Sequence, residues 1–491
     1  MGVTSVLTRL EVRGFKNLAD VDVRFGPFTC VAGANGAGKS NLFDALQLLS
    51  LLAERPLEEA ARTVRGGAAG AESLLCRLGG EPAAHLTLAA EMIVPPRGID
   101  DYGQEAGATS TFLRYELTLA RRSDGRRSAT PDGAGALAVV EETLTHVPEG
   151  EAHRHLPFEH SAARWRESVV ASRRRAPYFI STEDRPAGRS VVLHQDGEPL
   201  GAPRAFEAAR LPRTVLSGAS AAESPTALLA REEMRGWRLL QPEPSALREP
   251  DALTAPGRLG PRGAHLAATL HRLAHAGARP PEGIYAEVGS TLAALCDDVA
   301  AVRVERDEER RLLTVRVRAP DGADHPAAAL SDGSLRLLAL AVLAADRGGW
   351  RLLALEEPEN GVHPGRLGAM LALLQEAAVD PEQPVDESNP LRQVIVNTHS
   401  PAAVARVPAD SLLVAAAGPS GAAAFHPLPG TWRDGLPGGA PPVTAGALRD
   451  YLDPVSLDAL RRERELRRSP RPRVAERDDL APRLPFPEPA E

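Results

Sequence analysis

Hydrophobic and polar residues alternate over much of the first thirty positions. Residues 10–13 and residues 21–25 place apolar side chains on one face and charged side chains on the other. This period of two is typical of half-buried β-strands. Residues 28–32 are mostly apolar and predict a fully buried strand, which is followed by a glycine-rich loop. The leucine-rich residues 41–54 have helical spacing, so a strand, a loop and a helix are expected in this order.

The pattern of the remaining residues predicts further strands, then a helical region and a hairpin, and finally a unit of alternating helices and strands. Strands are expected at residues 85–94, 112–120, 137–145 and 189–194, between loops rich in glycine and proline. Residues 221–280 have a helical pattern that prolines interrupt, and residues 302–317 predict a hairpin around a charged turn. An α/β unit follows, with helices at 335–346 and 364–378 and strands at 352–355 and 394–396.

Charge and composition exclude several classes of protein. The 491 residues include 57 basic and 65 acidic side chains, a net charge of −8. This excludes a uniformly basic nucleic-acid-binding surface, although it leaves room for a local basic patch. No apolar run approaches the ~20 residues of a membrane-spanning helix, so no membrane association is expected. Only Lys16 and Lys39 are lysines among the basic residues, which draws attention to both positions.

Cysteines and the N-terminal sequence bear on the cellular compartment. Cys30, Cys76 and Cys296 lack the spacing of a metal site and cannot all pair with one another. This usage is typical of a reducing environment. Arg9 and Glu11 lie where a signal peptide needs an apolar core. A cytoplasmic protein is therefore expected.

An arginine-rich segment covers residues 164–175. It has the charge to contact nucleic acid phosphates, but a solvated loop is the simpler interpretation and the one that we favour. The chain beyond residue 460 begins with an arginine-rich helical stretch and ends in proline-rich sequence, so disorder is expected there.

The glycine-rich loop matches the phosphate-binding pattern G-x-x-x-x-G-K-[ST] without deviation. In such a loop the backbone N–H groups and the helix N-terminus surround the phosphates of a nucleotide. Lys39 is expected to reach the β- and γ-phosphates of ATP, and the Ser40 hydroxyl to ligate Mg²⁺. The alternative is a chance glycine-rich turn, which the strand before the loop and the helix after it argue against. The nucleotide-binding residues are predicted to be Gly33, Ala34, Asn35, Gly36, Ala37, Gly38, Lys39, Ser40 and Asn41.

Two adjacent carboxylates follow the apolar strand at residues 352–355. Glu356 would hold Mg²⁺, and Glu357 would be the general base that orients and activates the attacking water. Alone, two glutamates after a strand could equally begin a solvated helix. Downstream of a phosphate-binding loop, a catalytic role is the stronger interpretation.

Two further motifs lie on either side of this acidic pair. Residues 330–334, LSDGS, open a helix, and Ser331, Gly333 and Ser334 could form a second anion-binding helix N-terminus, although an ordinary N-cap remains the alternative. Asp332 would lie awkwardly beside a phosphate unless its side chain turns away. The strand at 394–396 ends in Asn-Thr-His-Ser-Pro, where His399 could contact the γ-phosphate.

The order of these motifs resembles the ABC-type ATPase heads of the RecF/SMC class. The N-terminal residues 13–18, RGFKNL, are similar to the strand ending that opens these proteins. More narrowly, the chain is similar to the compact RecF-like ATPases of the AAA family in bacteria. That resemblance includes Tyr-Glu-Leu at 115–117, Glu-Glu-Thr-Leu at 141–144, and a stretch from Trp237 to Arg248 that was expected to be helical.

The resemblance implies a fold and a domain division. The fold class is α/β, an ABC-type P-loop NTPase head with a mixed N-terminal β lobe, a helical insert and a parallel-sheet core. The expected units are an N-terminal ATPase lobe with Walker A (residues 1–210), a helical insert (211–282), a C-terminal ATPase lobe with signature, Walker B and His switch (283–430), and a partly disordered tail (431–491).

The resemblance also implies partners and roles. Two heads would pair head to tail, each ATP lying between the phosphate loop of one chain and Ser331–Ser334 of the other. Asn360 and Gly361 would cross the dimer interface, and His399 would be the γ-phosphate switch. The family's Mg²⁺-sensing glutamine has no clear position, since neither Gln47 nor Gln104 has a persuasive context.

Two differences between this sequence and the family pattern restrict its possible functions. No long heptad array predicts the coiled-coil arms of SMC proteins, and the glutamate and D-x-D of a Toprim nuclease domain are not found after His399. The first hypothesis is an ATP-gated clamp on double-stranded DNA in repair or recombination. The second is a sensor or regulator of a separately encoded effector in an antiphage defence or toxin-like module. A nucleotide-binding protein without turnover fits poorly with intact Lys39, Glu357 and His399.

Overall fold

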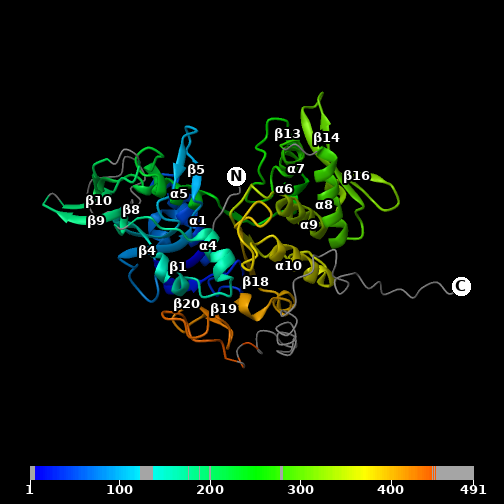
Figure 1. The fold of residues 1–491 in the computed structure, drawn as a ribbon. Helices are drawn as coiled ribbons and strands as arrows, with labels where there is room; N and C mark the ends of the chain where they lie inside the picture. The colour runs from blue at the N-terminus through cyan, green and yellow to red at the C-terminus, as the bar shows by residue number, and fades with distance from the viewer. Residues whose placement is uncertain are drawn as a thin grey trace.

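The computed structural model describes residues 6–121, 137–174, 176–186, 188–197, 201–276 and 280–444, together with residues 446 and 448. Figure 1 shows two lobes, the N-terminal strands in one and the helices α7–α9 in the other. Most of the predicted tail, residues 431–491, lies outside the described residues, so its expected partial disorder stays a prediction. No helix in the described ranges is both long and apolar enough to cross a membrane.

A six-stranded sheet lies at the centre of the molecule, in the order β12-β17-β18-β3-β19-β20. Its first five strands are parallel and β20 is antiparallel. Because the strands are parallel, the carboxyl ends of β3, β17 and β18 meet at one edge, where α/β proteins place their ligands. The strands are β3 (Phe28–Ala32), β12 (Trp237–Leu240), β17 (Leu352–Glu356), β18 (Gln393–Thr398), β19 (Leu412–Ala417) and β20 (Ala423–Pro427).

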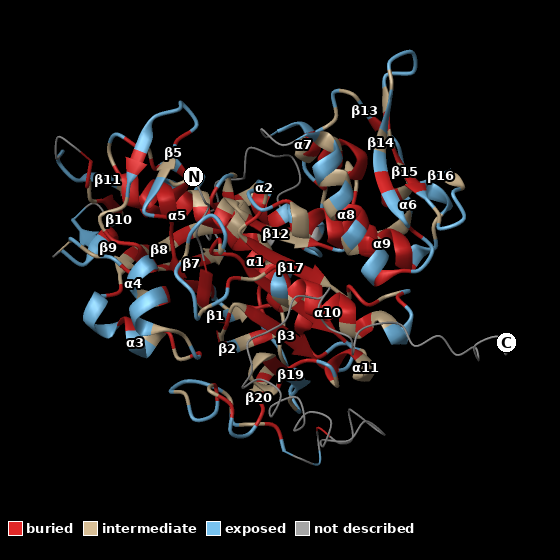
Figure 2. Ribbon diagram, turned by 45° about the vertical axis from the view of Figure 1, so that its right-hand side comes forward, coloured by how far each residue is buried: buried red, intermediate tan, exposed pale blue. Residues whose placement is uncertain are grey.

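Both faces of this sheet are buried (Figure 2). Along β17, Leu352 and Ala354 pack into the core that contains helix α1 (Lys39–Leu52), while Leu353 and Leu355 pack into the core of the opposite face. That second core contains α9 (Asp332–Ala345) and α10 (Leu367–Glu376). A strand buried on both faces has a continuous apolar sequence, which explains the apolar runs that precede each motif.

An eight-stranded antiparallel sheet packs on the α1 side, in the order β11-β10-β9-β8-β7-β4-β1-β2. Four of its strands lie within a residue of the ranges that the sequence predicted, and β9 and β11 were not anticipated. The strands are β1 (Val6–Phe15), β2 (Leu18–Arg24), β4 (His85–Ile93), β7 (Phe112–Arg121), β8 (Leu137–His146), β9 (Tyr178–Arg185), β10 (Gly188–Leu193) and β11 (Arg204–Glu207).

The second lobe is built on helices and a small sheet. The predicted hairpin is confirmed as β14 (Ala301–Asp307) and β15 (Leu312–Arg318), with β13 (Asp251–Ala252) and β16 (Asp324–Pro326) beside β15. Helices α7 (Leu266–His275) and α8 (Pro281–Leu295) share the second core with α9. The shorter elements are α2 (Leu57–Thr63), α3 (Ala152–His155), α4 (Glu167–Val169), α11 (Pro401–Val404), β5 (Arg97–Ile99) and β6 (Glu105–Gly107).

The stretch from Trp237 to Arg248 is not the helix that was expected. It begins with β12, which pairs in parallel with β17, and only its second part is helical, as α6 (Pro244–Arg248). The reason is tertiary, because this short segment, apolar except for Arg238, finds its backbone partners at the open edge of a sheet. Within 211–282, helices α5 (Pro225–Arg235), α6 and α7 thus accompany a strand of the central sheet. The domain boundaries themselves stay a prediction.

The Tyr-Glu-Leu and Glu-Glu-Thr-Leu segments meet inside the first core. The Tyr115 hydroxyl donates to Glu142 Oε1 at 3.2 Å, and both side chains are fully buried. The Glu142 carboxylate also accepts the N–H groups of Val215 and Leu216 at 2.7 and 2.8 Å. A side chain of β8 therefore fixes the chain segment that leads to α5, which gives these two motifs a structural role.

Glu142 predicts a pH dependence of stability. Burial raises its pKa to about 7, whereas an unfolded glutamate has a pKa of about 4.3. The folded state therefore retains a proton that the unfolded state releases. The resulting stabilisation, on the order of 3 kcal/mol, is complete below about pH 4.3 and lost as the pH rises through about 7. We expect Glu142→Gln to remove this part of the pH dependence in urea unfolding measured from pH 5 to 8.

The comparison needs a control, because other groups also titrate over this range. Glu308→Gln alters a largely exposed glutamate of the β14–β15 turn, and its unfolding free energy should follow the wild-type pH profile. The decisive quantity is the slope and not the absolute stability, since the glutamine also loses a hydrogen-bond acceptor. Parallel profiles for wild type and Glu142→Gln would show that Glu142 does not titrate.

Candidate functional site

The phosphate-binding loop joins β3 to α1 and is held against β19. A Cβ added to Gly33 would lie 2.4 Å from the carbonyl oxygen of Ala415 on β19, and its φ of 154° favours glycine as well. The N-cap of α1 is Gly38, so no side chain caps the helix. The first N–H groups of the helix thus have no capping oxygen, which is the arrangement that binds an anion.

Lys39 lies across this loop. Its Nζ donates to the carbonyl oxygens of Gly33 and Ala34 at 2.6 and 2.9 Å, and the residue is only 6% exposed. Burial lowers the pKa of the ammonium group, while Glu357, Glu359 and Glu356 act in the opposite direction. The loop lysine and the predicted acidic pair are therefore brought together, although more than 300 residues separate them in the sequence.

Glu357 has a strained backbone at the end of β17. Its φ is 45°, a left-handed conformation that a glutamate adopts rarely and that concentrates at functional sites. Its N–H donates to both the carbonyl oxygen and the side-chain oxygen of Asn397, at 3.1 and 3.0 Å. Asn397 lies opposite Glu356 on β18 and is buried, so it holds the turn that aims Glu357.

The carboxylate of Glu357 is oriented at both oxygens. Asn360 Nδ2 donates to Oε2 at 2.8 Å, and His399 Nδ1 lies 2.8 Å from Oε1. Burial alone would raise the pKa of Glu357, but the hydrogen bonds from Asn360 and His399 and the charge of Lys39 hold this pKa below its usual value. Glu357 is therefore an ionised, positioned acceptor at neutral pH, which is what a general base requires.

Arg65, which the sequence motifs did not indicate, contacts both the backbone of Ser40 and the side chain of Glu356. Arg65 Nη2 contacts the Ser40 carbonyl oxygen at 3.3 Å, Asp44 Oδ1 at 3.1 Å and Glu356 Oε1 at 3.0 Å. Arg65 follows α2 in a segment without a recognisable motif, so only the tertiary structure shows its position.

The donors at this point fit Mg²⁺. A hydroxyl and a carboxylate are the hard oxygen ligands that this ion prefers, and it is commonly bound by one or two protein groups together with phosphate oxygens and water. Within the described residues, no cluster of three His, Cys, Asp or Glu side chains forms a complete metal site. Ser40 and Glu356 thus match a nucleotide-associated metal.

Lys16 and Asn17 brace the helix that follows the loop. Lys16 Nζ donates to Asp44 Oδ2 at 2.6 Å and to the Arg65 carbonyl oxygen at 2.7 Å. Asn17 Oδ1 accepts from Asn41 Nδ2 at 2.8 Å. A cavity of about 590 Å³ opens beside these residues, with Glu72 and Arg77 among its walls. This gives the RGFKNL motif a physical role, because it joins the end of β1 to α1.

The signature residues Ser331–Ser334 form an N-cap and approach the Asn360–Gly361 loop. Ser331 Oγ accepts the Ser334 N–H at 3.1 Å, as the N-cap interpretation required. A Cβ added to Gly333 would lie 2.2 Å from the Gly361 carbonyl oxygen, so only glycine permits this approach. No hydrogen bond among the described residues joins 331–334 to the phosphate loop of the same chain.

Two arginines organise the signature segment. Arg248 Nη2 donates to Asp332 Oδ1 at 2.7 Å and to the Leu330 carbonyl oxygen at 3.2 Å. The Asp332 carboxylate is thereby turned toward Arg248, which resolves its awkward place in the motif. Arg336 Nη1 donates to the Asn360 carbonyl oxygen at 2.5 Å. The stretch from Trp237 to Arg248 therefore links the sheet edge at β12 to the signature.

The structure also offers a glutamine that sequence reasoning missed. Gln241 directly follows β12, and because Leu240 pairs with Leu355, Gln241 lies level with Glu356 at the carboxyl edge of the sheet. Of the two glutamines first considered, Gln47 is part of α1 and Gln104 lies in the β5–β6 turn. The apolar run before Gln241 was the available signal, and its interpretation as helix concealed it.

Comparisons with known proteins show which families and proteins the chain is similar to. Residues 180–405 match a family described as "AAA domain, putative AbiEii toxin, Type IV TA system", and residues 9–61 match a family described as "AAA domain". The chain is 31% identical over 152 residues to the DNA replication and repair protein RecF of Magnetococcus marinus, covering 30% of this chain and 34% of that protein. It is 28% identical over 149 residues to structural maintenance of chromosomes protein 1 of Schizosaccharomyces pombe, covering 28% of this chain and 10% of that protein.

The matched regions span only about a third and a tenth of these two curated relatives. Among solved structures, an SMC head bound to the C-winged helix domain of ScpA has a TM-score of 0.47 at 14% identity, covering 86% of this chain and 97% of that chain. The two family matches include the phosphate loop, the signature, the acidic pair and His399. They confirm the resemblance that the motifs indicated.

Proposed function

The chain is a RecF- and SMC-like ATPase head, and we propose that it binds ATP with Mg²⁺, hydrolyses it and pairs head to tail with a second copy around the nucleotide. The observation that carries this proposal is the geometry of Glu357, whose carboxylate is held by Asn360 and His399 within the electrostatic reach of Lys39. A general base beside a phosphate-binding lysine is the minimal apparatus for phosphoryl transfer to water.

Binding is assigned to the phosphate loop and its helix. The N–H groups at the start of α1 and the Lys39 ammonium provide donors and positive charge for the β- and γ-phosphates. Lys39 exchanges its bonds to the Gly33 and Ala34 carbonyl oxygens for phosphate oxygens. The cavity beside Lys16 and Asn17 has room for the adenine base of ATP. Gln241 is proposed as the metal-sensing glutamine, because it lies level with Glu356.

Hydrolysis is assigned to Glu357 and the groups around it. Mg²⁺, held by Ser40 and Glu356, would neutralise charge that develops on the phosphates. Glu357 accepts a proton from the attacking water, while Asn360 and His399 keep its carboxylate in one orientation. His399 is 42% exposed at its side chain, so it is accessible to the γ-phosphate.

Pairing of two heads is supported by the separation of the signature from the phosphate loop within one chain. Figure 1 shows α9 in one lobe and α1 in the other. Ser331 and Asp332 are exposed at the start of α9, which leaves this helix N-terminus available to a nucleotide held by a second copy. The contact between Gly333 and Gly361 would transmit the position of the signature to the loop that carries Asn360.

We place this ATPase on DNA, in repair or recombination. Support comes from the similarity to RecF, a DNA replication and repair protein. In the arginine-rich segment, Arg174 lies over the Phe179 ring and donates to the Tyr178 carbonyl oxygen, whereas Arg164 and Arg173 are exposed and could contact phosphates. A sensor or regulator of a separately encoded effector is the second candidate, favoured by the toxin-system description of the family that matches 180–405.

The test is the ATPase rate with and without double-stranded DNA at two salt concentrations. Stimulation or binding at low salt that weakens steeply with added salt is expected for contacts with phosphates. An ATPase that neither binds DNA nor responds to it at low salt would contradict the DNA assignment. That outcome would favour the second candidate and leave the hydrolysis mechanism in place.

Arg65 predicts a change in the Mg²⁺ requirement. Its guanidinium shares Glu356 with the metal site, and the side chain is 53% exposed. Removing it leaves the carboxylate free for the metal. We expect Arg65→Ala to lower the Mg²⁺ concentration for half-maximal hydrolysis by about two- to fivefold, the effect of one partly screened ion pair.

The matched control is Arg55→Ala, which removes an arginine paired with Glu59 on the neighbouring helix. Its Mg²⁺ titration should coincide with that of the wild type. An unchanged or higher requirement in Arg65→Ala would show that Arg65 does not compete with the metal for Glu356.

A further inference from the structure

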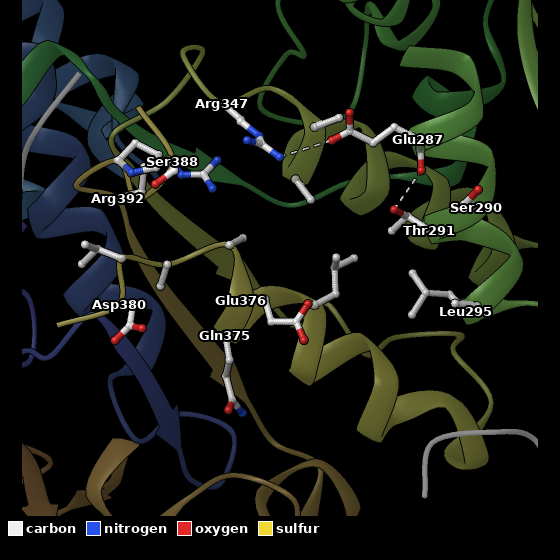
Figure 3. A pocket seen from close by; sticks show the side chains of 18 residues that line it. Glu287, Ser290, Thr291, Leu295, Arg347, Gln375, Glu376, Asp380, Ser388 and Arg392 are labelled. Atoms are coloured by element: carbon white, nitrogen blue, oxygen red, sulfur yellow. Dashed lines mark hydrogen bonds and ion pairs between the residues drawn. The ribbon is translucent and has the colours of Figure 1, made fainter. Parts of the chain in front are cut away.

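A second cavity, of about 600 Å³, lies away from the ATPase site, at the opposite ends of α9 and β18. Its walls come from α8, the end of α9, the end of α10 and the segment before β18 (Figure 3). The volume is within the range of small-molecule sites. The described wall residues include none of the residues assigned above to nucleotide binding or hydrolysis.

Arg392 is the unusual residue of this cavity. It directly precedes β18 and is only 7% exposed, yet its Nε and Nη1 atoms are sealed from solvent without a hydrogen-bond partner among the described residues. Its guanidinium lies over the Trp350 ring, with 4.6 Å to the ring centre. Burial lowers its pKa to about 10, which leaves it charged at neutral pH. The charge of Asp346 acts in the opposite direction, but no described carboxylate lies within ion-pair distance of Arg392. A buried charge compensated only in this way is unfavourable.

A second guanidinium lies on the same side of the cavity, that of Arg347 (Figure 3). Its nearest carboxylate oxygen, on Glu287, is 3.7 Å away, beyond hydrogen-bond distance. Arg347 is also close enough to Arg392 for their charges to repel. An anionic group between the two guanidinium groups would be attracted by both charges and would remove that repulsion.

The remaining wall residues restrict which other chemical groups such a ligand can have. Leu295, Leu373 and Ala377 contribute apolar surface, whereas Glu287, Glu376 and Asp380 are acidic. Figure 3 shows Glu376 across the cavity from the two arginines. A ligand with negative charge at both ends would meet these carboxylates, while an apolar or amino-bearing body would not. The lining therefore selects one anionic group on a small organic molecule.

We propose that this cavity binds a small molecule through one carboxylate or phosphate group held between Arg392 and Arg347. The site lies at the beginning of β18, the strand that ends next to His399, and at the end of α9, the helix that begins with the signature. It requires no nucleotide in the phosphate loop, so its occupancy can be measured independently of ATP hydrolysis.

The experiment follows Trp350 fluorescence during titration with four probes: inorganic phosphate, glycerol phosphate, butyrate and 4-aminobutyrate. Because Trp350 contacts Arg392, binding at this site should change its emission saturably. The change should be lost in Trp350→Phe, which separates it from phosphate bound at the P-loop. A response to the phosphates alone or to the carboxylates alone identifies which anionic group the site accepts.

Three variants decide the assignment. Arg392→Lys keeps the charge but loses the planar fork, and Arg347→Glu reverses a charge on a side chain that is 59% exposed. Each should weaken binding by about tenfold or more, the value of one charge-assisted contact. Arg310→Glu makes the same reversal on a side chain that is 80% exposed in the β14–β15 turn, and it should bind like the wild type.

Two results would overturn the proposal. The first is the lack of a saturable response to all four probes at millimolar concentration. The second is a probe that binds the Arg347→Glu variant as tightly as it binds the Arg310→Glu variant. The Arg347→Glu measurement remains decisive even if Arg392→Lys fails to fold, because an exposed side chain at the rim can be changed without disturbing the core. Neither result bears on the ATPase assignment.

Discussion

Replacing Glu357 with glutamine is expected to lower the ATP turnover rate by about 10²- to 10⁴-fold, the usual contribution of a general base. The amide keeps the size of the side chain and an acceptor for Asn360, so the site should retain its shape. It cannot accept a proton from water. ATP binding should therefore persist, and the head-to-tail pair should accumulate, measured as phosphate release and as light scattering with ATP.

The control for Glu357→Gln is Glu308→Gln, which makes the same substitution at a side chain that is 68% exposed. It should turn over ATP like the wild type and show no excess dimer. Unreduced turnover in Glu357→Gln would place the base elsewhere. A variant that binds ATP but stays monomeric at micromolar protein would instead contradict the paired-head arrangement and spare the base assignment.

The residues of this site could be located from the sequence because each motif directly follows one strand. The phosphate loop follows β3, the acidic pair follows β17, and the segment with His399 follows β18. Parallel strands present their carboxyl ends at one edge, so motifs that are distant in sequence meet in the fold. His399 contacts Glu357 at this edge, while the catalytic roles stay proposals.

Residues without a motif could not be found in this way. Arg65 reaches Glu356 only because α2 packs near α1, and no local pattern encodes that approach. Gln241 was missed for a different reason. A short segment with three apolar residues and one arginine fits a helix or a strand equally well. The open edge beside β17 decides for the strand.

The two lysines differ in the same way: a sequence motif explains one of them, and only the tertiary structure explains the other. Lys16 has a φ of 48° and reaches both Asp44 and the Arg65 carbonyl oxygen, so its role is to join the end of β1 to the loop helix. The sequence left this position without a physical explanation. For Lys39 the explanation was available from the motif alone, since a compact ammonium fits among phosphate oxygens.

Lys39→Ala is accordingly expected to weaken ATP binding by about a hundredfold or more. It removes contacts to two phosphates, each worth about 1.5–3 kcal/mol for a charged donor. It also leaves the three carboxylates that face Lys39, Glu356, Glu357 and Glu359, without their nearest compensating charge. Equilibrium binding of a fluorescent ATP analogue measures the loss, with thermal unfolding to confirm that the fold is retained.

Two substitutions of lysine by arginine separate charge from shape. Lys39→Arg retains the charge, but a planar guanidinium does not fit the loop that encloses the ammonium group, so binding should still be weak. Lys16→Arg can retain an ion pair with Asp44, and ATP affinity close to that of the wild type is expected. If Lys39→Ala bound ATP as tightly as the wild type, the loop could not be the phosphate site. If Lys39→Arg alone bound tightly, charge and not shape would explain why this position carries a lysine.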